Sequence, residues 1–218
     1  RAIGVHVNFA PVVDVNNNAR NPVINTRSFG EDPAAVGRLA AAYVRGLRAG
    51  GVLATVKHFP GHGDTDIDSH VGLPIIPYTR ERLRAVEWPP FRDGIAAGAD
   101  GVMTAHIVLP ALEAEAGLPS TLSRAVIGGV LRGEFGFDGL IFTDSMQMGA
   151  VADRWPSGQA AVLALAAGND VLLHPADAVA AFDGVRDAVA RGELSVERIR
   201  ESASRMLRAK ARLGLHRS

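Results

Sequence analysis

Residues 32–59, "DPAAVGRLAAAYVRGLRAGGVLATVKHF", join a helical pattern directly to a buried-strand pattern. The helical part begins with a cap residue, Asp32, followed by Pro in the first turn, and it stops at a Gly-Gly pair. The strand part is a short, β-branched apolar run that ends in Lys57 and His58. The stretch therefore predicts one helix followed at once by one buried strand.

The same alternation continues along the chain. Apolar runs predict strands near residues 5–15, 52–59, 101–109, 139–146 and 170–175. Helical patterns lie near 79–98, with a break at Pro89 and Pro90, and near 123–133, 157–167, 177–191 and 195–214. In the last of these, five apolar residues fall on one face, namely Val196, Ile199, Ala203, Met206 and Leu207. Alternating strands and helices predict an α/β fold with a parallel sheet covered by helices.

Composition narrows the class of protein. A chain of 218 residues with 47% apolar and 21% charged residues predicts one globular domain with a substantial core. The formal net charge is zero, so nothing favours nucleic acid or an anionic membrane surface as a partner. No apolar run approaches the roughly 18 residues that span a bilayer. The absence of cysteine excludes disulfides, thiolate metal ligands and a thiol nucleophile.

The predicted strands share one further property, which is that nearly all of them end in polar residues. These residues are Asp14, Lys57, His58, His106, Asp144, Ser145 and His174. In α/β folds of this kind, active sites form at the carboxyl ends of the strands. The pattern therefore predicts a polar pocket at one end of the sheet. Strand ends that only meet solvent are the alternative reading. The Asn residues of "RNPVINTRSFGEDP", residues 20–33, predict turns rather than ligands.

The stretch "VKHFPGHGDTDIDSH", residues 56–70, is the most polar of these strand ends. Asp68 and His70 are two residues apart, so in an extended segment both project to one side and form an acid–base pair. Gly61 and Gly63 predict a relaxed backbone that carries His70 into and out of the site. Two alternatives stay open, a solvated loop and a metal site. The metal site would use His62, Asp64, Asp66, Asp68 and His70, although their spacing matches no regular zinc pattern.

Asp144 ends a strongly apolar strand, "GLIFTDSM", and is a candidate nucleophile. A carboxylate on a buried strand is unfavourable unless it is paired or functional. A helix cap or an ion pair is the structural alternative. A carboxylate nucleophile with a separate proton donor is the layout of a retaining glycosidase, in which the carboxylate forms a covalent glycosyl-enzyme.

Five motifs together resemble glycoside hydrolase family 3, and more closely its β-N-acetylhexosaminidase branch. They are "NFAPVVDV", "NTRSFGEDP", "KHFPGHGDTDIDSH", "MTAHIVLPAL" and "GFDGLIFTDSMQMGAV". The resemblance implies that Asp144 is the nucleophile, that His70 is the acid/base and that Asp68 is its partner. It further implies that Arg27, Lys57 and His58 bind the sugar. The implied substrates are terminal β-linked N-acetylglucosaminides from muropeptides or chitooligosaccharides, with no metal and no organic cofactor.

The resemblance also implies a (β/α)8 TIM-barrel-type fold, of which the predicted strands match about the last five. Residues 1–218 are therefore expected to be a single catalytic domain of the family's N-terminal type that lacks the first strands of the barrel. Five strands cannot close a barrel. Two functional alternatives stay open, an N-acetylglucosaminide phosphorylase and an inactive carbohydrate-binding fragment of the same fold.

Overall fold

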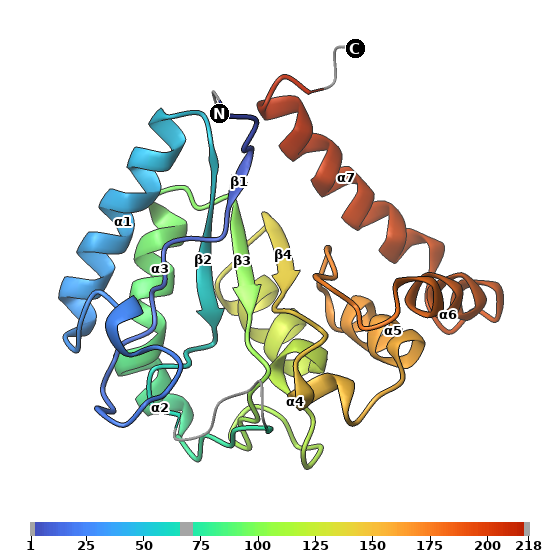
Figure 1. The fold of residues 1–218 in the computed structure, drawn as a ribbon, viewed down its shortest axis with the longest axis horizontal. Helices are drawn as coiled ribbons and strands as arrows, with labels where there is room; N and C mark the ends of the chain where they lie inside the picture. Colours follow the sequence, from blue (N-terminus) through green and yellow to red (C-terminus); the bar gives the residue numbers. More distant parts are fainter. Residues whose placement is uncertain (1–2, 66–71, 216–218) are drawn as a thin grey trace.

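The computed structural model describes residues 3–65 and 72–215 and contains a parallel sheet with the strand order β1-β2-β3-β4. The strands are β1 (Val7–Asn8), β2 (Leu53–Phe59), β3 (Gly101–Thr104) and β4 (Leu140–Thr143). All three strand pairings are parallel, and a single parallel bridge joins Phe142 of β4 to Val171. The predicted parallel α/β class is confirmed (Figure 1).

All four paired strands are shorter than the apolar runs that predicted them, although β2 is shorter by only one residue. The run at 101–109 pairs only as far as Thr104, and the run at 170–175 contributes the single bridge at Val171. Ala105, Ile107 and Leu109 are nevertheless buried. The apolar run therefore predicted burial correctly, whereas pairing stops because the chain turns into the loops at the carboxyl edge.

Helices follow the strands in the predicted places. The longer ones are α1 (Pro33–Ala49), α3 (Trp88–Ala96), η4 (Ala125–Glu134), α5 (Ser157–Ala167), α6 (Ala178–Ala190) and α7 (Val196–Arg212). The shorter ones are η1 (Asn25–Arg27), α2 (Arg80–Arg82), η2 (Leu83–Glu87), η3 (Ser120–Leu122) and α4 (Gly149–Ala152). The Asp32 side chain caps α1 by accepting the Ala35 N–H at 2.6 Å, as the sequence predicts. Within the described ranges, no helix combines the length and apolar character needed to cross a membrane.

The predicted break at Pro89 and Pro90 is wrong. The chain is helical from α2 through η2, a π-helical segment, into α3 without interruption. Both prolines lie in the first turn of α3, where a missing N–H and a fixed φ are tolerated. The preceding π-helical turn shifts the hydrogen-bond pattern, so the two prolines remove no α-helical bond in the middle of a helix.

The main core lies between the sheet and the helices α1, α3 and η4 (Figure 1). It contains Val56 and Phe59 from β2, Val102 from β3, Ile141 from β4 and Phe91 from α3. A second, smaller cluster, formed by Met103, Leu140 and Phe142, packs against Phe9 and against Met206 of α7. Both faces of the sheet thus carry apolar side chains, as expected for strands in a barrel-type α/β fold.

Helix α7 does not pack through the face that its apolar pattern predicts. Val196 and Leu207 remain 51% and 64% exposed, and Ala203 is exposed as well. Ile199 and Met206 do contact the core. The prediction of one five-residue apolar face is therefore wrong.

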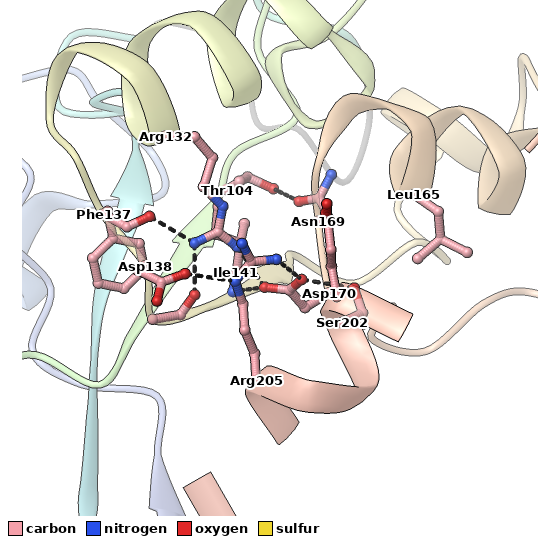
Figure 2. Close-up of polar contacts among 12 residues, drawn as sticks. Thr104, Arg132, Phe137, Asp138, Ile141, Leu165, Asn169, Asp170, Ser202 and Arg205 are labelled. Carbon is pink, nitrogen blue, oxygen red and sulfur yellow. Dashed lines mark hydrogen bonds and ion pairs between the residues drawn. The ribbon is translucent and has the colours of Figure 1, made fainter. Parts of the chain in front are cut away.

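The face of α7 that turns inward carries Arg198, Ser202 and Arg205, and these converge on Asp170 (Figure 2). The Asp170 side chain is fully buried. Ser202 Oγ donates to Asp170 Oδ1 at 2.7 Å, and Arg132 of η4 donates to Oδ2 at 2.6 Å. A polar anchor therefore decides how α7 docks, which is why hydrophobic periodicity misplaced its buried face.

Candidate active site

Four polar residues lie at the carboxyl edge of the sheet. Lys57 and His58 belong to the end of β2, His106 follows β3, and Asp144 is the first residue after β4. Figure 1 shows β2, β3 and β4 ending at the same edge, as parallel strands do. His58 and His106 are buried, while Lys57 and Asp144 are half-buried. This edge is where a parallel α/β fold places catalytic groups.

Two hydrogen bonds with backbone groups hold Asp144 in place. Its N–H donates to the Thr104 carbonyl at 3.1 Å, and its Oδ1 accepts the Ser145 N–H at 2.8 Å. The Ser145 carbonyl in turn accepts a hydrogen bond from His106 Nε2 at 3.0 Å. Because a carbonyl only accepts, the proton of that contact is on Nε2. The turn that carries Asp144 is thereby fixed to β3.

The electrostatic surroundings of Asp144 favour its ionised form. Burial raises the pKa of this carboxyl, but the charges that His58 and His106 carry when they are protonated, the Ser145 N–H and the charge of Lys57 outweigh burial. The net result is a pKa below the ordinary aspartate value. A carboxylate that is charged at neutral pH and fixed by backbone is suited to attack an electrophilic carbon.

Two cations lie near this carboxylate. Burial lowers the pKa of Lys57, the charge of Arg27 lowers it further, and Asp144 and Asp14 partly offset this. Arg27, in η1, donates from Nη1 to the Val23 carbonyl at 3.0 Å, and its Nη2 lies 3.4 Å from His58 Nε2. The structure therefore brings Arg27, Lys57 and His58 together beside Asp144.

Asp14 lies behind these residues and is fully buried. Its carboxylate accepts the N–H groups of His58 and His62 and contacts His58 Nδ1 at 2.7 Å. The Lys57–His58 and Phe59–Pro60 peptide bonds in this turn are cis. Asp14 therefore neither meets solvent nor lines an open pocket, and its carboxylate is used in internal hydrogen bonds.

The segment after β2 is anchored at its base. The His62 carbonyl accepts a hydrogen bond from Asn21 Nδ2 at 2.8 Å, and Thr65 Oγ1 lies 2.7 Å from His62 Nδ1. Burial lowers the pKa of His62 to about 4, and the charge of His58 adds to this, so His62 is neutral at neutral pH. Asn21 is therefore both the turn former that the sequence predicts, because its Oδ1 accepts the Val23 and Ile24 N–H groups, and a cross-link to this base.

The two glycines at this base do not relax the backbone, contrary to the prediction. A Cβ on Gly63 would lie 1.8 Å from the Val15 carbonyl oxygen, and a Cβ on Gly61 would lie 2.8 Å from Glu87 Cβ. Gly61 also has φ +126°, a backbone conformation that other residues rarely adopt. Both glycines permit close packing of backbone against its neighbours, so the segment up to Thr65 is clamped.

The remaining predicted site residues differ in position. Asp68 and His70, and with them Asp66 of the metal alternative, lie outside the described residues. His174 is exposed, with a left-handed backbone (φ 45°). Within residues 3–65 and 72–215, no group of three potential metal-ligating side chains is placed to hold an ion.

Comparisons with known proteins identify the family and the fold of this chain. The glycosyl hydrolase family 3 N terminal domain matches residues 1–209. Beta-hexosaminidase A of Pseudoalteromonas piscicida is 38% identical over 97% of the chain, which spans 39% of that relative. A solved glycoside hydrolase family 3 beta-N-acetylglucosaminidase from Paenibacillus sp. str. FPU-7 superposes with a TM-score of 0.96 at 48% identity. That superposition covers 100% of this chain and 42% of the solved one. The solved beta-glucoside phosphorylase BglX superposes with a TM-score of 0.94 at 33% identity, covering 98% of this chain and 40% of that one.

The fold and its relatives define a TIM-barrel-type α/β domain, of which this chain contains part. The chain belongs to glycosyl hydrolase family 3. The chain matches these relatives over nearly its whole length, but it spans only about two fifths of their length.

Proposed function

We propose that this chain supplies the catalytic residues of a retaining β-N-acetylhexosaminidase that removes terminal β-linked N-acetylglucosamine. The observation that carries the proposal is the ionised Asp144 at the end of β4, beside Lys57 and the Arg27–His58 pair. Relatives named beta-hexosaminidase and beta-N-acetylglucosaminidase support this substrate class. Because those relatives are bacterial, muropeptides and chitooligosaccharides are the natural sources of such sugars that we propose.

The first half of the proposed reaction forms a covalent intermediate. Asp144 attacks the anomeric carbon, the bond from that carbon to the leaving oxygen breaks, and its electron pair stays with that oxygen. Protonated His70 gives a proton to the departing oxygen, and Asp68 stabilises the imidazolium beforehand. Arg27, Lys57 and His58 bind hydroxyl groups of the same sugar and hold the anomeric carbon against the carboxylate.

The second half returns the enzyme to its starting state. Neutral His70 accepts a proton from water while the water oxygen bonds to the anomeric carbon, and the bond to Asp144 breaks. The product keeps the β configuration because two inversions occur. Lys57 and Arg27 stabilise the carboxylate that is released.

The experiment that tests this assignment compares two aryl glycosides and two variants. We expect hydrolysis of an aryl β-N-acetylglucosaminide to exceed that of an aryl β-glucoside. Asp144→Asn should lower kcat at least about 10³-fold and His70→Ala roughly 10²–10⁴-fold. Asp138→Asn, on a carboxylate 72% exposed and remote from the site, is the matched control and should change little. Full activity in Asp144→Asn would refute the role of Asp144.

Trapping the intermediate tests the covalent step directly. A 5-fluoro N-acetylglucosaminyl fluoride slows both half-reactions because fluorine destabilises the oxocarbenium-ion-like transition state, while the fluoride leaving group still departs. Intact-mass measurement should show one glycosyl adduct on the wild-type protein, with peptide mapping placing it on Asp144. An adduct on another residue, or inversion of configuration in the product, would contradict the mechanism.

Phosphorolysis is the second candidate, because one similar solved structure is a beta-glucoside phosphorylase. A neutral imidazole repels inorganic phosphate less than a second carboxylate would, so phosphate can replace water in the second half-reaction. The product is then a sugar 1-phosphate. Product analysis with and without phosphate separates the two reactions. An inactive carbohydrate-binding fragment would instead bind N-acetylglucosaminides without turnover in either condition.

The domain proposal is that residues 1–218 are one catalytic domain whose barrel is completed by strands outside this chain. Within residues 3–65 and 72–215 the sheet has four paired strands, and Val171 adds an isolated bridge to β4, which is too few strands to close a barrel. The mass of the protein purified from its native source tests this. A native protein of the mass of this chain, with full activity, would contradict the proposal.

A further inference from the structure

The buried carboxylate of Asp14 plays no part in the reaction steps above, yet it is one of the most heavily hydrogen-bonded groups near the site. It accepts the His62 N–H at 2.7 Å and the His58 N–H at 3.0 and 3.2 Å. Its Oδ2 lies 2.7 Å from Nδ1 of the His58 ring. Both ends of the turn from His58 to His62 therefore bind one side chain that comes from a distant part of the sequence.

The contacts of the His58 ring determine where its protons are. The pKa of Asp14 lies below the ordinary value, because the charge that His58 carries when it is protonated, the hydrogen bond from its ring, and the charge and N–H of His62 outweigh the raising effect of burial. Asp14 is therefore ionised and only accepts, so the proton of the 2.7 Å contact is on His58 Nδ1. On the other side of the ring, Arg27 Nη2 lies 3.4 Å from Nε2. A guanidinium only donates, so Nε2 must present its lone pair.

A doubly protonated His58 is the competing state, and the surroundings contain groups that favour each state. Asp14 and Asp144 would stabilise an imidazolium, and such an imidazolium would lower the pKa of Asp144 as described above. Lys57 and Arg27 oppose it. The contact with Arg27 decides between the two, because protonated Nε2 would direct an N–H at a group that has no acceptor atom.

We propose that Asp14 is a positioning residue that holds His58 as the neutral tautomer with its proton on Nδ1. Nε2 then presents its lone pair, which faces Arg27 Nη2 at 3.4 Å; a ligand hydroxyl replaces this long contact by donating to Nε2 while it accepts from Arg27 or Lys57. This role resembles that of a buried carboxylate that orients a catalytic histidine, but here the oriented ring binds rather than transfers a proton.

The consequence for the ligand rests on the proposed function. A sugar hydroxyl can accept from Arg27 or Lys57 and donate to His58 Nε2 at the same time. A ligand oxygen without a hydrogen, as in a methyl ether or a carboxylate, cannot satisfy Nε2. Sites built to bind a hydroxyl reject analogues that lack it by large factors, because a buried polar group is left unpaired. The site therefore selects a hydroxyl-bearing ligand at this position.

The first test measures the tautomer and needs no substrate. In protein labelled with ¹⁵N at histidine, long-range ¹H–¹⁵N correlation spectra distinguish protonated from unprotonated ring nitrogens, and His58→Gln assigns the signals. At neutral pH we expect Nδ1 of His58 to be protonated and Nε2 to be unprotonated. An imidazolium, or a proton on Nε2 alone, would overturn the proposal whatever the protein's activity.

The second test exchanges the tautomer. In Asp14→Asn the amide oxygen still accepts a backbone N–H, while the amide NH₂ faces Nδ1 and moves the ring proton to Nε2. We expect the ¹⁵N signals to invert and kcat/KM for an aryl β-N-acetylglucosaminide to fall by roughly 10- to 10²-fold, as expected for the loss of one buried hydrogen bond to the substrate. Asp170→Asn, on an equally buried carboxylate away from the site, is the matched control and should leave the His58 tautomer unchanged.

The outcomes separate this proposal from the proposed function. If His58 has the expected tautomer but no hexosaminide is cleaved, the positioning role stands and the assigned activity fails. If Asp14→Asn inverts the signals without changing kcat/KM, Asp14 positions the ring but Nε2 does not bind the substrate. If Asp14→Asn does not fold, the wild-type spectrum still decides the tautomer.

Discussion

Asp14 and Asp170 are both fully buried carboxylates that collect several hydrogen bonds, yet they lie at different ends of the sheet and bind different kinds of partner. Asp14, beside the end of β2, is satisfied by two backbone N–H groups and an imidazole. Asp170, beside the start of β4, is satisfied by the Ile141 N–H, a serine hydroxyl and three guanidinium groups (Figure 2).

The difference lies in what remains available for a ligand. Arg132, Arg198 and Arg205 use further donors on backbone carbonyls or a second carboxylate, as when Arg132 Nη1 donates to the Phe137 and Gly139 carbonyls at 2.7 Å. Their positive charges are used to fix α7 and η4 to the sheet. Asp14 leaves the lone pair of His58 Nε2 on the site side of the ring, where it faces Arg27. A buried carboxylate paired with counter-charges thus acts as a clamp, and one paired with neutral donors can orient a ligand-binding group.

The largest effect on stability is expected from a substitution of Asp170. Asp170→Ala leaves three nearly buried guanidinium groups without their shared carboxylate, and we expect a loss of about 3–5 kcal/mol in the free energy of unfolding. Urea unfolding measures this. Catalytic rate per folded molecule should be unchanged, in contrast to Asp14→Asn.

Asp138 provides the control for that prediction, because it pairs with Arg205 and Arg208 but is 72% exposed. Asp138→Ala should cost less than about 1 kcal/mol. A loss below about 1 kcal/mol in Asp170→Ala as well would show that the backbone carbonyls alone hold the arginines. The description of Asp170 as a clamp would then be wrong.

The close packing of the segment from Gly61 to Thr65, which lies near Asp14, can be tested by substituting Gly63. The added Cβ of Gly63→Ala would meet the Val15 carbonyl at 1.8 Å, so backbone must shift, and we expect a loss of about 3 kcal/mol. The matched control is Gly46→Ala in α1, where an added Cβ meets nothing within 4 Å and should stabilise by roughly 0.5–1 kcal/mol. Unchanged stability in Gly63→Ala would restore the prediction of a relaxed loop.

The loss of folding stability at acidic pH is a smaller expected effect, and Asp170 contributes to it. The pKa of Asp170 is lowered because the hydroxyl of Ser202, the charge of Arg132, the Ile141 N–H and the charge of Arg205 outweigh the raising effect of burial. A lowered carboxyl pKa contributes stability that is present above the unfolded value of about 3.9 and is lost as the pH falls through the folded value.

Unfolding measured at pH 6, 4 and 3 should therefore show the wild-type protein losing stability faster than Asp170→Asn. The difference between the two should narrow as the pH falls below about 3.9, because asparagine does not titrate. A constant difference between them across this range would mean that Asp170 has an ordinary pKa in the folded protein.

Sequence patterns predicted the parts of the molecule that follow local rules. Alternating strands and helices, the cap at Asp32 and the polar strand ends at Lys57, His58 and Asp144 all follow from neighbouring residues, and the structure has them where expected. The family resemblance also supplied roles for Asp68 and His70, which lie outside the described residues and remain predictions.

The remainder depends on contacts between distant segments. Asp14 meets His58 across 44 residues, and Asp170 meets Arg132 across 38, so neither partnership has a local pattern. Gly63 resembles a flexible loop residue until the Val15 backbone is placed beside it. Hydrophobic periodicity also misplaced the buried face of α7, because polar residues anchor that helix at Asp170 beside the apolar contacts of Ile199 and Met206.

Helix α7 provides the smallest and most direct test of that failure. Ser202→Ala removes a 2.7 Å hydrogen bond to the Asp170 carboxylate, and since Ala favours the helix slightly, the net loss should be about 1 kcal/mol. Leu207→Lys removes an apolar side chain that the sequence pattern predicts to be buried, but Leu207 is 64% exposed, so stability should change by less than about 0.5 kcal/mol. Urea unfolding of both variants measures which of them loses more stability. If Leu207→Lys were the more damaging change, α7 would dock through its apolar face, and the polar anchor at Asp170 would be secondary to it.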